Sequence, residues 1–171
     1  LKEDSKGNLW IGTSRAGVYK LTTDGGVKKY DKSNGLNGEL YRTVTELSDN
    51  TILVAGDSGM SFIKDDDSVY NIGTQMINSK VLCTLQADDK TIFAGTDGNG
   101  IEVIRDGVIV GNFGKNEGLS SGVILRMVED SSGDGIFIVT SNSICYMDKT
   151  QNIRVLKNFP YYNNYDIVNG K

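Results

Sequence analysis

The chain has 171 residues, of which 38% are hydrophobic, and its 18 basic and 22 acidic side chains give a net charge of −4. Because basic residues are not in excess, the surface lacks the positively charged patch that nucleic-acid binding requires. The absence of histidine from the sequence excludes a histidine-ligated zinc site, a histidine general base and a Ser-His-Asp triad in this segment.

A phrase of two short apolar runs, joined by a glycine, a small polar residue and a turn, occurs four times, at residues 8–21, 52–63, 92–104 and 136–147. Its anchor residues are 44, 39 and 44 residues apart, at Gly12, Gly56, Gly95 and Val139. A period of roughly 40 to 45 residues built from strands and turns is typical of a β-propeller with one four-stranded blade per repeat. The 21 glycines against one proline suit many tight turns. We therefore predict an all-β fold, a single propeller segment over residues 1–171 with approximate repeats at 1–43, 44–81, 82–124 and 125–164, and a fifth blade beginning at 165–171.

The first strand of a repeat is expected to alternate apolar and polar residues and to end in an Asp-rich hairpin turn, as at 41–50, 81–90 and 124–135. The second strand carries bulky apolar residues without alternation, which indicates burial on both faces, at 9–11, 53–54, 92–93 and 137–138. The glycine that ends three of these runs is expected to allow close backbone approach. Third strands are predicted at 18–21, 60–63, 101–104 and 144–147. Fourth strands, more polar and therefore at the solvent-facing edge of each blade, are predicted at 27–30, 69–72, 108–113 and 153–156.

Several single residues can be placed from this pattern. Trp10 lies in a second strand and is expected in the core, and Tyr19 and Tyr30 are expected to pack between blades. Cys83 and Cys145 lie in apolar runs at different positions of the repeat, which favours two free, buried thiols over a disulfide. No stretch approaches the roughly 18 apolar residues of a membrane span, and no signal peptide is visible. The chain begins inside a predicted strand, so we expect it to be part of something longer.

Three segments carry a family resemblance: "EDSKGNLWIGTSRAGVYKLT", "GLNGELYRTVTELSDNTILVAG" and "GLSSGVILRMVEDSSGDGIFIVT". They resemble the two-component regulator propeller repeat, which runs Gly-Leu, loop, Val-x-x-Ile, Glu-Asp-x-x-Gly-x, Leu-Trp-Ile-Gly-Thr and Gly-Leu-Tyr. The resemblance extends over essentially the whole chain. It departs where 47–49 replace the Glu-Asp turn and where Val139 replaces the glycine.

The resemblance implies an extracytoplasmic sensor domain of a membrane-bound signalling protein, whose output is a hybrid histidine kinase or a diguanylate cyclase. Most propellers of this family have seven or more blades. We therefore expect about four blades of a larger propeller, completed by further blades or by self-association, with the membrane reached only through other parts of the parent.

Several polar segments resemble metal-binding or catalytic motifs, but each has a simpler interpretation. Segments 97–100 and 130–135 resemble parts of a calcium loop but lack a distal bidentate glutamate, so hairpin turns are expected. Segment 64–67 is interpreted as a solvated hairpin connection. Thr13 and Ser14 have no base to activate them. We predict no catalytic residue, no metal site and no cofactor, and hence no enzymatic activity in this segment.

A ligand site is expected on one face of the propeller. The loop that enters the first strand of a blade and the turn between second and third strands should lie on the same face, and propellers gather functional residues around the channel mouth. A small extracellular ligand such as a saccharide would be held there by polar or aromatic side chains, for which the candidates are Arg15, Tyr41, Arg42, Asp57, Asp97 and Asn142.

Two function classes remain open from the sequence. The first is a ligand-sensing input module of a bacterial signal-transduction protein. The alternative is a structural or protein-interaction propeller without a small-molecule ligand. A propeller lyase or hydrolase is disfavoured by the absence of histidine from the segment.

Overall fold

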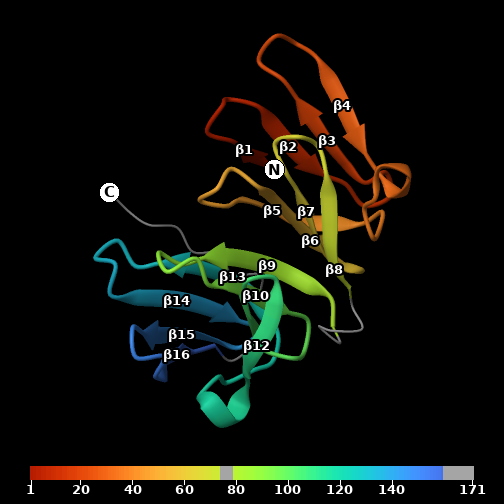
Figure 1. Cartoon of the computed structure of the whole chain (residues 1–171). Coiled ribbons are helices and arrows are strands. Elements are labelled where there is room, and N and C mark those ends of the chain that lie inside the picture. The colour runs from red at the N-terminus through yellow and green to blue at the C-terminus, as the bar shows by residue number, and fades with distance from the viewer. Residues whose placement is uncertain (74–78, 160–171) are drawn as a thin grey trace. The chain divides into compact units, whose positions relative to one another are not determined.

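The computed structural model describes residues 1–73 and 79–159. These residues form four antiparallel sheets of four strands each, and within every sheet the strands lie in chain order (Figure 1). The predicted all-β propeller architecture is confirmed, with one sheet for each repeat. The only helices among the described residues are two short 3-10 turns, η1 (Lys32–Asn34) and η2 (Lys115–Glu117).

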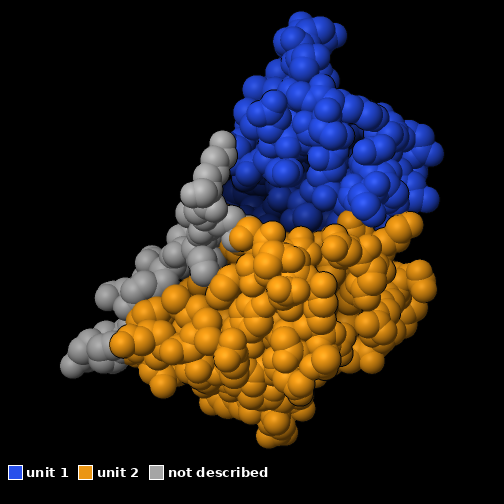
Figure 2. Space-filling view, turned by 90° about the vertical axis from the view of Figure 1, so that its left-hand side faces the viewer, with its two compact units in different colours: residues 1–81 blue, residues 82–171 orange. Residues whose placement is uncertain are grey.

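The strands of the first two sheets are β1 (Lys2–Glu3), β2 (Leu9–Gly12), β3 (Val18–Leu21), β4 (Val27–Tyr30), β5 (Tyr41–Glu46), β6 (Ile52–Gly56), β7 (Gly59–Ile63) and β8 (Val69–Gly73). Those of the last two sheets are β9 (Val81–Gln86), β10 (Ile92–Thr96), β11 (Ile101–Arg105), β12 (Val108–Phe113), β13 (Ile124–Glu129), β14 (Gly135–Thr140), β15 (Ser143–Asp148) and β16 (Ile153–Asn158). The chain divides into two compact units, residues 1–81 and residues 82–171, which Figure 2 distinguishes by colour. The repeat boundaries stated above stay a prediction, and the proposed fifth blade at 165–171 lies outside the described residues.

Burial follows strand position within each sheet. The second strands β6 and β10 are buried at every residue, as predicted for all four second strands. In the second strands β2 and β14, buried positions are interrupted by partly buried ones, so the prediction of burial on both faces is wrong there. The third strand β7 is also buried at every residue. The outer strands β12 and β16 are instead mostly exposed. The assignment of the polar fourth strands to the solvent-facing edge of the blades is therefore correct.

The core of residues 1–81 is built around Trp10, which is 3% exposed and stacks on Tyr30 with 5.5 Å between ring centroids. The predicted burial of Trp10 is confirmed. Tyr30 is also buried, and its hydroxyl donates a hydrogen bond to Asp67, whereas Tyr19 is only partly buried. In residues 82–171 the core contains Phe93, at the position in its sheet that Trp10 has in the first, and the free, fully buried Cys145.

The Gly-Leu pairs of the repeat have a structural role. Gly35 ends η1 with φ of 98°, and Gly118 ends η2 with φ of 109°. This left-handed conformation favours glycine, and it reverses the chain so that Leu36 and Leu119 are buried, at 4% and 3% exposure. The Gly-Leu signature thus marks the entry of the chain into the next blade.

The predicted close approach at glycine also has a clear example. A Cβ atom on Gly56 would lie 2.1 Å from the backbone oxygen of Leu40, so no other residue fits without a shift of the backbone. No helix of the described residues is long and apolar enough to cross a membrane. Within the same residues, no group of three or more Cys, Asp or Glu side chains is arranged to hold a metal ion.

Candidate functional site

The two kinds of loop expected to share a face are hydrogen-bonded to each other within residues 1–81. The backbone N–H of Gly17, in the turn between β2 and β3, donates to the oxygen of Glu39 at 3.0 Å. The N–H of Tyr41, at the start of β5, donates to the oxygen of Thr13 at 2.8 Å. Residues 82–171 repeat the arrangement, because the N–H groups of Gly98 and Gly100 both donate to the oxygen of Gly122. In the first and third sheets, the turn after the second strand is therefore held against the loop that enters the following sheet.

A depression of about 260 Å³ lies at this junction in residues 1–81, and it is lined by Arg15, Ala16, Lys29, Asp31, Lys32 and Glu39. The N-cap residue Asp31 begins η1 and places both lysines beside the turn that carries Arg15. The wall is thus made of backbone-anchored turns, with long charged side chains around it.

Most charges of this depression are paired. The ammonium of Lys29 lies 3.0 Å from a carboxylate oxygen of Asp31, and that of Lys32 lies 3.7 Å from Glu39. The exposed Arg15 makes no ion pair with any residue that the structure describes. Three cations and two carboxylates therefore leave one positive charge in excess, carried by a guanidinium that is available to a ligand.

Asp31 is firmly ionised. Hydrogen bonds from the hydroxyl of Ser33, at 2.6 Å, and from the ammonium of Lys29 lower the pKa of the Asp31 carboxyl to about 2. The backbone N–H of Ser33 adds a further bond of 2.8 Å. Since the same carboxylate caps η1, the structure of the turn and the charge of the depression depend on one side chain.

Arg42 and Asp57, both predicted site residues, are brought together by the pairing of β5 with β6. The Nε atom of Arg42 lies 2.8 Å from Oδ1 of Asp57, and the ammonium of Lys80 lies 3.7 Å from Oδ2. One half-exposed carboxylate is thus shared by two exposed cations, which leaves a second small excess of positive charge in residues 1–81.

Tyr41 was expected to contact a ligand, but its side chain lies in the core. It is 4% exposed, and its hydroxyl contacts the backbone N–H of Gly38, the amide oxygen of Asn37 and the hydroxyl of Ser61, at 3.1 to 3.2 Å. Burial raises the pKa of this phenol. Tyr41 therefore anchors the loop 37–40 from beneath.

The two remaining predicted residues, Asp97 and Asn142, lie in turns of residues 82–171. Asp97 is exposed and forms a backbone bridge with Val123. The amide oxygen of Asn142 accepts hydrogen bonds from the hydroxyls of Ser120 and Thr140, at 2.8 and 3.0 Å. Asn142 thus organises a hydroxyl-rich turn, and Asp97 is an exposed residue of the turn after β10.

Four charged residues near these sites were not predicted from the sequence: Lys29, Asp31, Lys32 and Lys80. The first three were assigned to a fourth strand and its connection, without a role. A signal was available in the similarity of "YDKSNGL" at 30–36 to "FGKNEGL" at 113–119, which marks a structured turn before each Gly-Leu pair. This similarity identifies the turn, but it does not show that the turn lies near Arg15, because that proximity depends on hydrogen bonds between loops.

A family model described as "Two component regulator propeller" matches residues 1–15. The chain carries a two-component regulator propeller repeat. The matched residues include Glu3-Asp4 and 9–13, on which the predicted resemblance rested, so the recognition of the repeat is confirmed. A search of curated proteins finds no match.

Solved structures with a similar fold cover most of this chain. The extracellular domain of a protein described as a hybrid two component system from B. thetaiotaomicron has a TM-score of 0.76 at 16% identity, covering 91% of this chain and 24% of that one. A second extracellular domain with this description from the same organism has a TM-score of 0.71 at 22% identity, covering 92% and 21%. A catalytically inactive virginiamycin B lyase from Staphylococcus aureus, with quinupristin, has a TM-score of 0.76 at 15% identity, covering 91% and 54%.

These likenesses show the β-propeller fold. The chain spans about a quarter of the length of the two extracellular domains and about half of the lyase.

Proposed function

We propose that this segment is part of the ligand-sensing input propeller of a membrane-bound bacterial signal-transduction protein. It lies outside the cytoplasm, performs no chemistry itself, and binds a saccharide or another small hydroxylated ligand at the depression beside Arg15. The parent protein carries further blades and the output domain.

One observation carries the proposal: a two-component regulator propeller repeat occurs in a chain whose fold matches extracellular domains of proteins described as hybrid two component systems. The repeat is found in residues 1–15, and the similarity of fold covers nine-tenths of the chain. Both support an input role.

The chemistry of the depression fits a polyhydroxylated ligand. Carboxylates such as Asp31 and Glu39 accept hydrogen bonds from hydroxyl groups, while Arg15 and the two lysines donate them. Charged partners make the stronger hydrogen bonds, and the backbone-anchored turns hold them in place. The hydroxyl-rich turn around Asn142 and the carboxylate of Asp97 offer the same kinds of group in residues 82–171.

A binding role is supported over catalysis by the comparison with the lyase. A variant of that enzyme in which a histidine is replaced by alanine is described as catalytically inactive. The present chain has no histidine at all, so it lacks the residue type on which that lyase depends.

The test is a titration of the ¹⁵N-labelled 171-residue chain with a panel of mono- and oligosaccharides, followed by NMR. We expect dissociation constants in the millimolar range, because only part of a channel mouth is present, with shifts at 15–17, 29–32 and 39–42. Arg15→Ala should reduce the affinity, whereas the matched loss of a positive charge at the exposed Lys157 should not. The absence of any shift in these turns, or equal effects of both substitutions, would contradict the proposal.

A second candidate function is a protein-interaction propeller. It is favoured by the outer strand β12, on which Val108 and Val110 are each 55% exposed. An edge strand with exposed valines is suited to pairing with another chain.

A further inference from the structure

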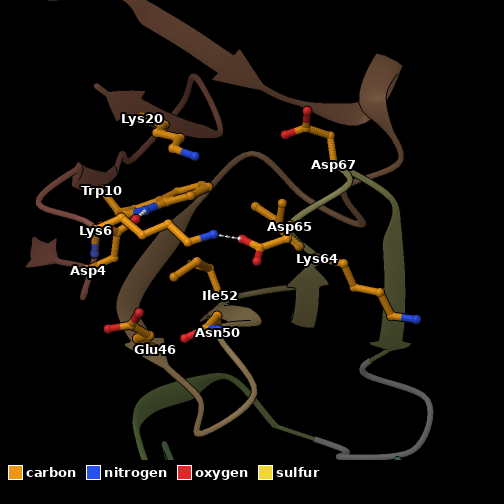
Figure 3. A pocket seen from close by; sticks show the side chains of 11 residues that line it. Asp4, Lys6, Trp10, Lys20, Glu46, Asn50, Ile52, Lys64, Asp65 and Asp67 are labelled. Atoms are coloured by element: carbon orange, nitrogen blue, oxygen red, sulfur yellow. Dashed lines mark hydrogen bonds and ion pairs between the residues drawn. The ribbon is translucent and has the colours of Figure 1, made fainter. Parts of the chain in front are cut away.

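The hairpins at the other ends of the strands carry a second feature that differs between the two units. In residues 1–81, a notch between the first and second sheets is filled and retains only about 10 Å³ of free space (Figure 3). In residues 82–171, the corresponding place between the third and fourth sheets is a groove of about 290 Å³. The lining of the groove consists of Ala87, Asp88, Asp89, Phe93, Glu129, Gly133, Gly135, Ile136, Met147, Asp148, Lys149 and Gln151.

Strand register establishes which residues correspond. In the first sheet Trp10 pairs with Lys20, and in the third Phe93 pairs with Val103. Ile52 pairs with Ile63 in the second sheet, as Ile136 pairs with Met147 in the fourth. The floors of notch and groove are therefore equivalent.

The hairpin turns correspond in the same way. The N–H of Asp4 donates to the oxygen of Asn8, as that of Ala87 donates to Thr91. Lys6 in the first hairpin therefore corresponds to Asp89 in the third. The hairpins after β7 and β15 likewise match Asp65 with Lys149.

The notch of residues 1–81 is filled by an aromatic ring with two ammonium groups. The ammonium of Lys20 lies 5.0 Å from the centroid of the Trp10 ring, a cation–π contact. The ammonium of Lys6 lies 2.6 Å from Asp65 across the notch (Figure 3). The indole N–H in turn donates to Asp4 at 2.7 Å.

Each of these filling groups is absent from the groove of residues 82–171. Phenylalanine replaces the larger indole, and alanine replaces the carboxylate that holds it. Val103 replaces Lys20, and Asp89 replaces Lys6. The result is a cavity with an apolar floor of Phe93, Ile136 and Met147, where the other unit has a packed interior.

The charge of the groove is strongly negative. Four carboxylates line it, those of Asp88, Asp89, Glu129 and Asp148, against one ammonium, that of Lys149. That ammonium lies 3.7 Å from Asp134, and the carboxylate of Asp89 lies 3.9 Å from the guanidinium of Arg105; neither Asp134 nor Arg105 is part of the lining. Hydrogen bonds from Thr91 lower the pKa of Asp89, and those from Thr150 and Asn152 lower the pKa of Asp148, so both are ionised at neutral pH.

We propose that this groove is a binding site for a small organic cation with an apolar, preferably aromatic, body. Such a ligand restores what the other unit supplies from its own side chains: an apolar group on the floor and an ammonium among the carboxylates. The volume of about 290 Å³ equals that of about ten water molecules and lies near the lower end of small-molecule pockets, roughly 300 to 1,000 Å³.

The site is separate from the proposed saccharide site. Within residues 82–171, Asp97 and Asn142 follow the carboxyl ends of β10 and β14, whereas the groove lies beside the hairpins that precede these strands.

The test uses 2-phenylethylamine as the probe and 2-phenylethanol, its neutral analogue, as the control, each titrated into the 171-residue chain and followed by NMR and calorimetry. We expect the amine to bind with chemical-shift changes at 87–91, 133–136 and 147–151. Its affinity should fall with rising salt, as expected for a charge-dependent contact, and the alcohol should bind at least tenfold more weakly. Equal binding of amine and alcohol, or no binding of the amine, would overturn the proposal.

Two variants separate charge from shape. Asp88→Asn removes an exposed carboxylate and should lower the affinity for the amine about threefold, as expected for a solvent-screened charge. The control Asp106→Asn, in the hairpin between β11 and β12, should leave this affinity unchanged. The double substitution Ala87→Asp with Phe93→Trp rebuilds the filling of the other unit. It should lower the affinity at least tenfold although it adds a negative charge; unchanged affinity in a folded double variant would refute the site.

Discussion

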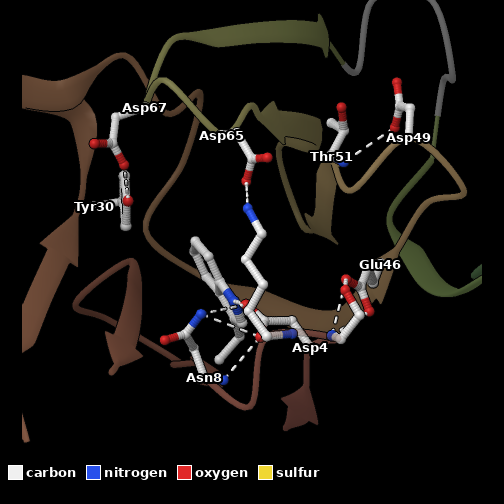
Figure 4. Close-up of polar contacts among 11 residues, drawn as sticks. Asp4, Asn8, Tyr30, Glu46, Asp49, Thr51, Asp65 and Asp67 are labelled. Carbon is white, nitrogen blue, oxygen red and sulfur yellow. Dashed lines mark hydrogen bonds and ion pairs between the residues drawn. The ribbon is translucent and has the colours of Figure 1, made fainter. Parts of the chain in front are cut away.

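The indole Nε1 of Trp10 donates a hydrogen bond of 2.7 Å to Oδ2 of Asp4, and both residues are buried, at 3% and 8% exposure. The same carboxylate accepts bonds from the side-chain amide and backbone N–H of Asn8 (Figure 4). Asp4 therefore closes the first hairpin and fixes the ring that fills the interior of residues 1–81. In the first repeat, the Glu-Asp turn and the Leu-Trp strand are thus joined by a direct hydrogen bond.

Replacement of Asp4 by alanine should destabilise residues 1–81 by about 2 to 4 kcal/mol, because a buried indole N–H and a buried amide lose a charged acceptor. Urea unfolding followed by the fluorescence of the single tryptophan measures this. Asp49→Ala is the matched control: Asp49 is also a hairpin aspartate, but it is exposed, with a bond of 3.0 Å to the N–H of Thr51, and its loss should cost under about 1 kcal/mol. Equal effects would contradict the assigned role of Asp4.

Trp10→Ala should cost about 3 to 5 kcal/mol, the usual range for deletion of a large core aromatic. Trp10→Phe should cost less, since the third sheet tolerates phenylalanine at the same position. Circular dichroism is the appropriate probe, as the fluorophore is removed. A melting temperature unchanged by Trp10→Ala would show that the ring does not pack as described.

Low pH should reduce the stability of residues 1–81 against unfolding, because Asp4 becomes protonated. Burial raises the pKa of this carboxyl, but the hydrogen bonds from Trp10 and Asn8 outweigh burial, and the pKa is lowered overall. A carboxyl whose folded-state pKa lies below its unfolded value of about 3.9 contributes fully above that pH and loses its contribution as the pH falls through the folded-state pKa. Urea midpoints should therefore drop below about pH 4, and drop less in Asp4→Asn. Identical pH profiles for the two proteins would exclude Asp4 as a source of the dependence.

Gly17→Ala should destabilise the turn that carries Arg15. Gly17 has φ of 77°, and a Cβ atom there would lie 2.1 Å from the backbone oxygen of Tyr30. Gly25→Ala is the control, because Gly25 has φ of 88° but no atom within 4 Å of an added Cβ. The control should cost about 1 to 2 kcal/mol for the left-handed conformation alone. Unfolding by urea should show a clearly larger loss for Gly17→Ala, and similar losses would mean that the close approach relaxes freely.

Self-association should occur through β12 if the exposed valines are an interaction surface. Sedimentation velocity of the 171-residue chain is expected to show species larger than a monomer as concentration rises, and Val110→Lys should reduce them, because a charge on an edge strand opposes pairing. Ser131→Lys adds the same charge in an exposed hairpin and should have no effect. A monomer at all concentrations would argue against this surface.

The sequence by itself determined the repeat, the strands and much of the core, including Trp10, but not the burial of Tyr41. Spacing of the apolar runs and the polarity of the fourth strands are local properties of the chain, and local alternation is sufficient to separate a middle strand such as β6 from an outer strand such as β12. The glycine at position 56 could be interpreted for the same reason, since only a missing side chain permits close backbone approach.

The tertiary structure decided which of these residues meet. The pair Arg42–Asp57 depends on the register of β5 against β6, and the depression beside Arg15 depends on the hydrogen bond between Gly17 and Glu39, in different loops. The groove beside Phe93 depends on which side chains meet between the third and fourth sheets; the equivalent place beside Trp10 is filled. Such sites are assembled across turns and sheets by backbone hydrogen bonds between residues far apart in the chain. No local pattern of residues carries that information, because each side chain involved is ordinary for its own turn or strand.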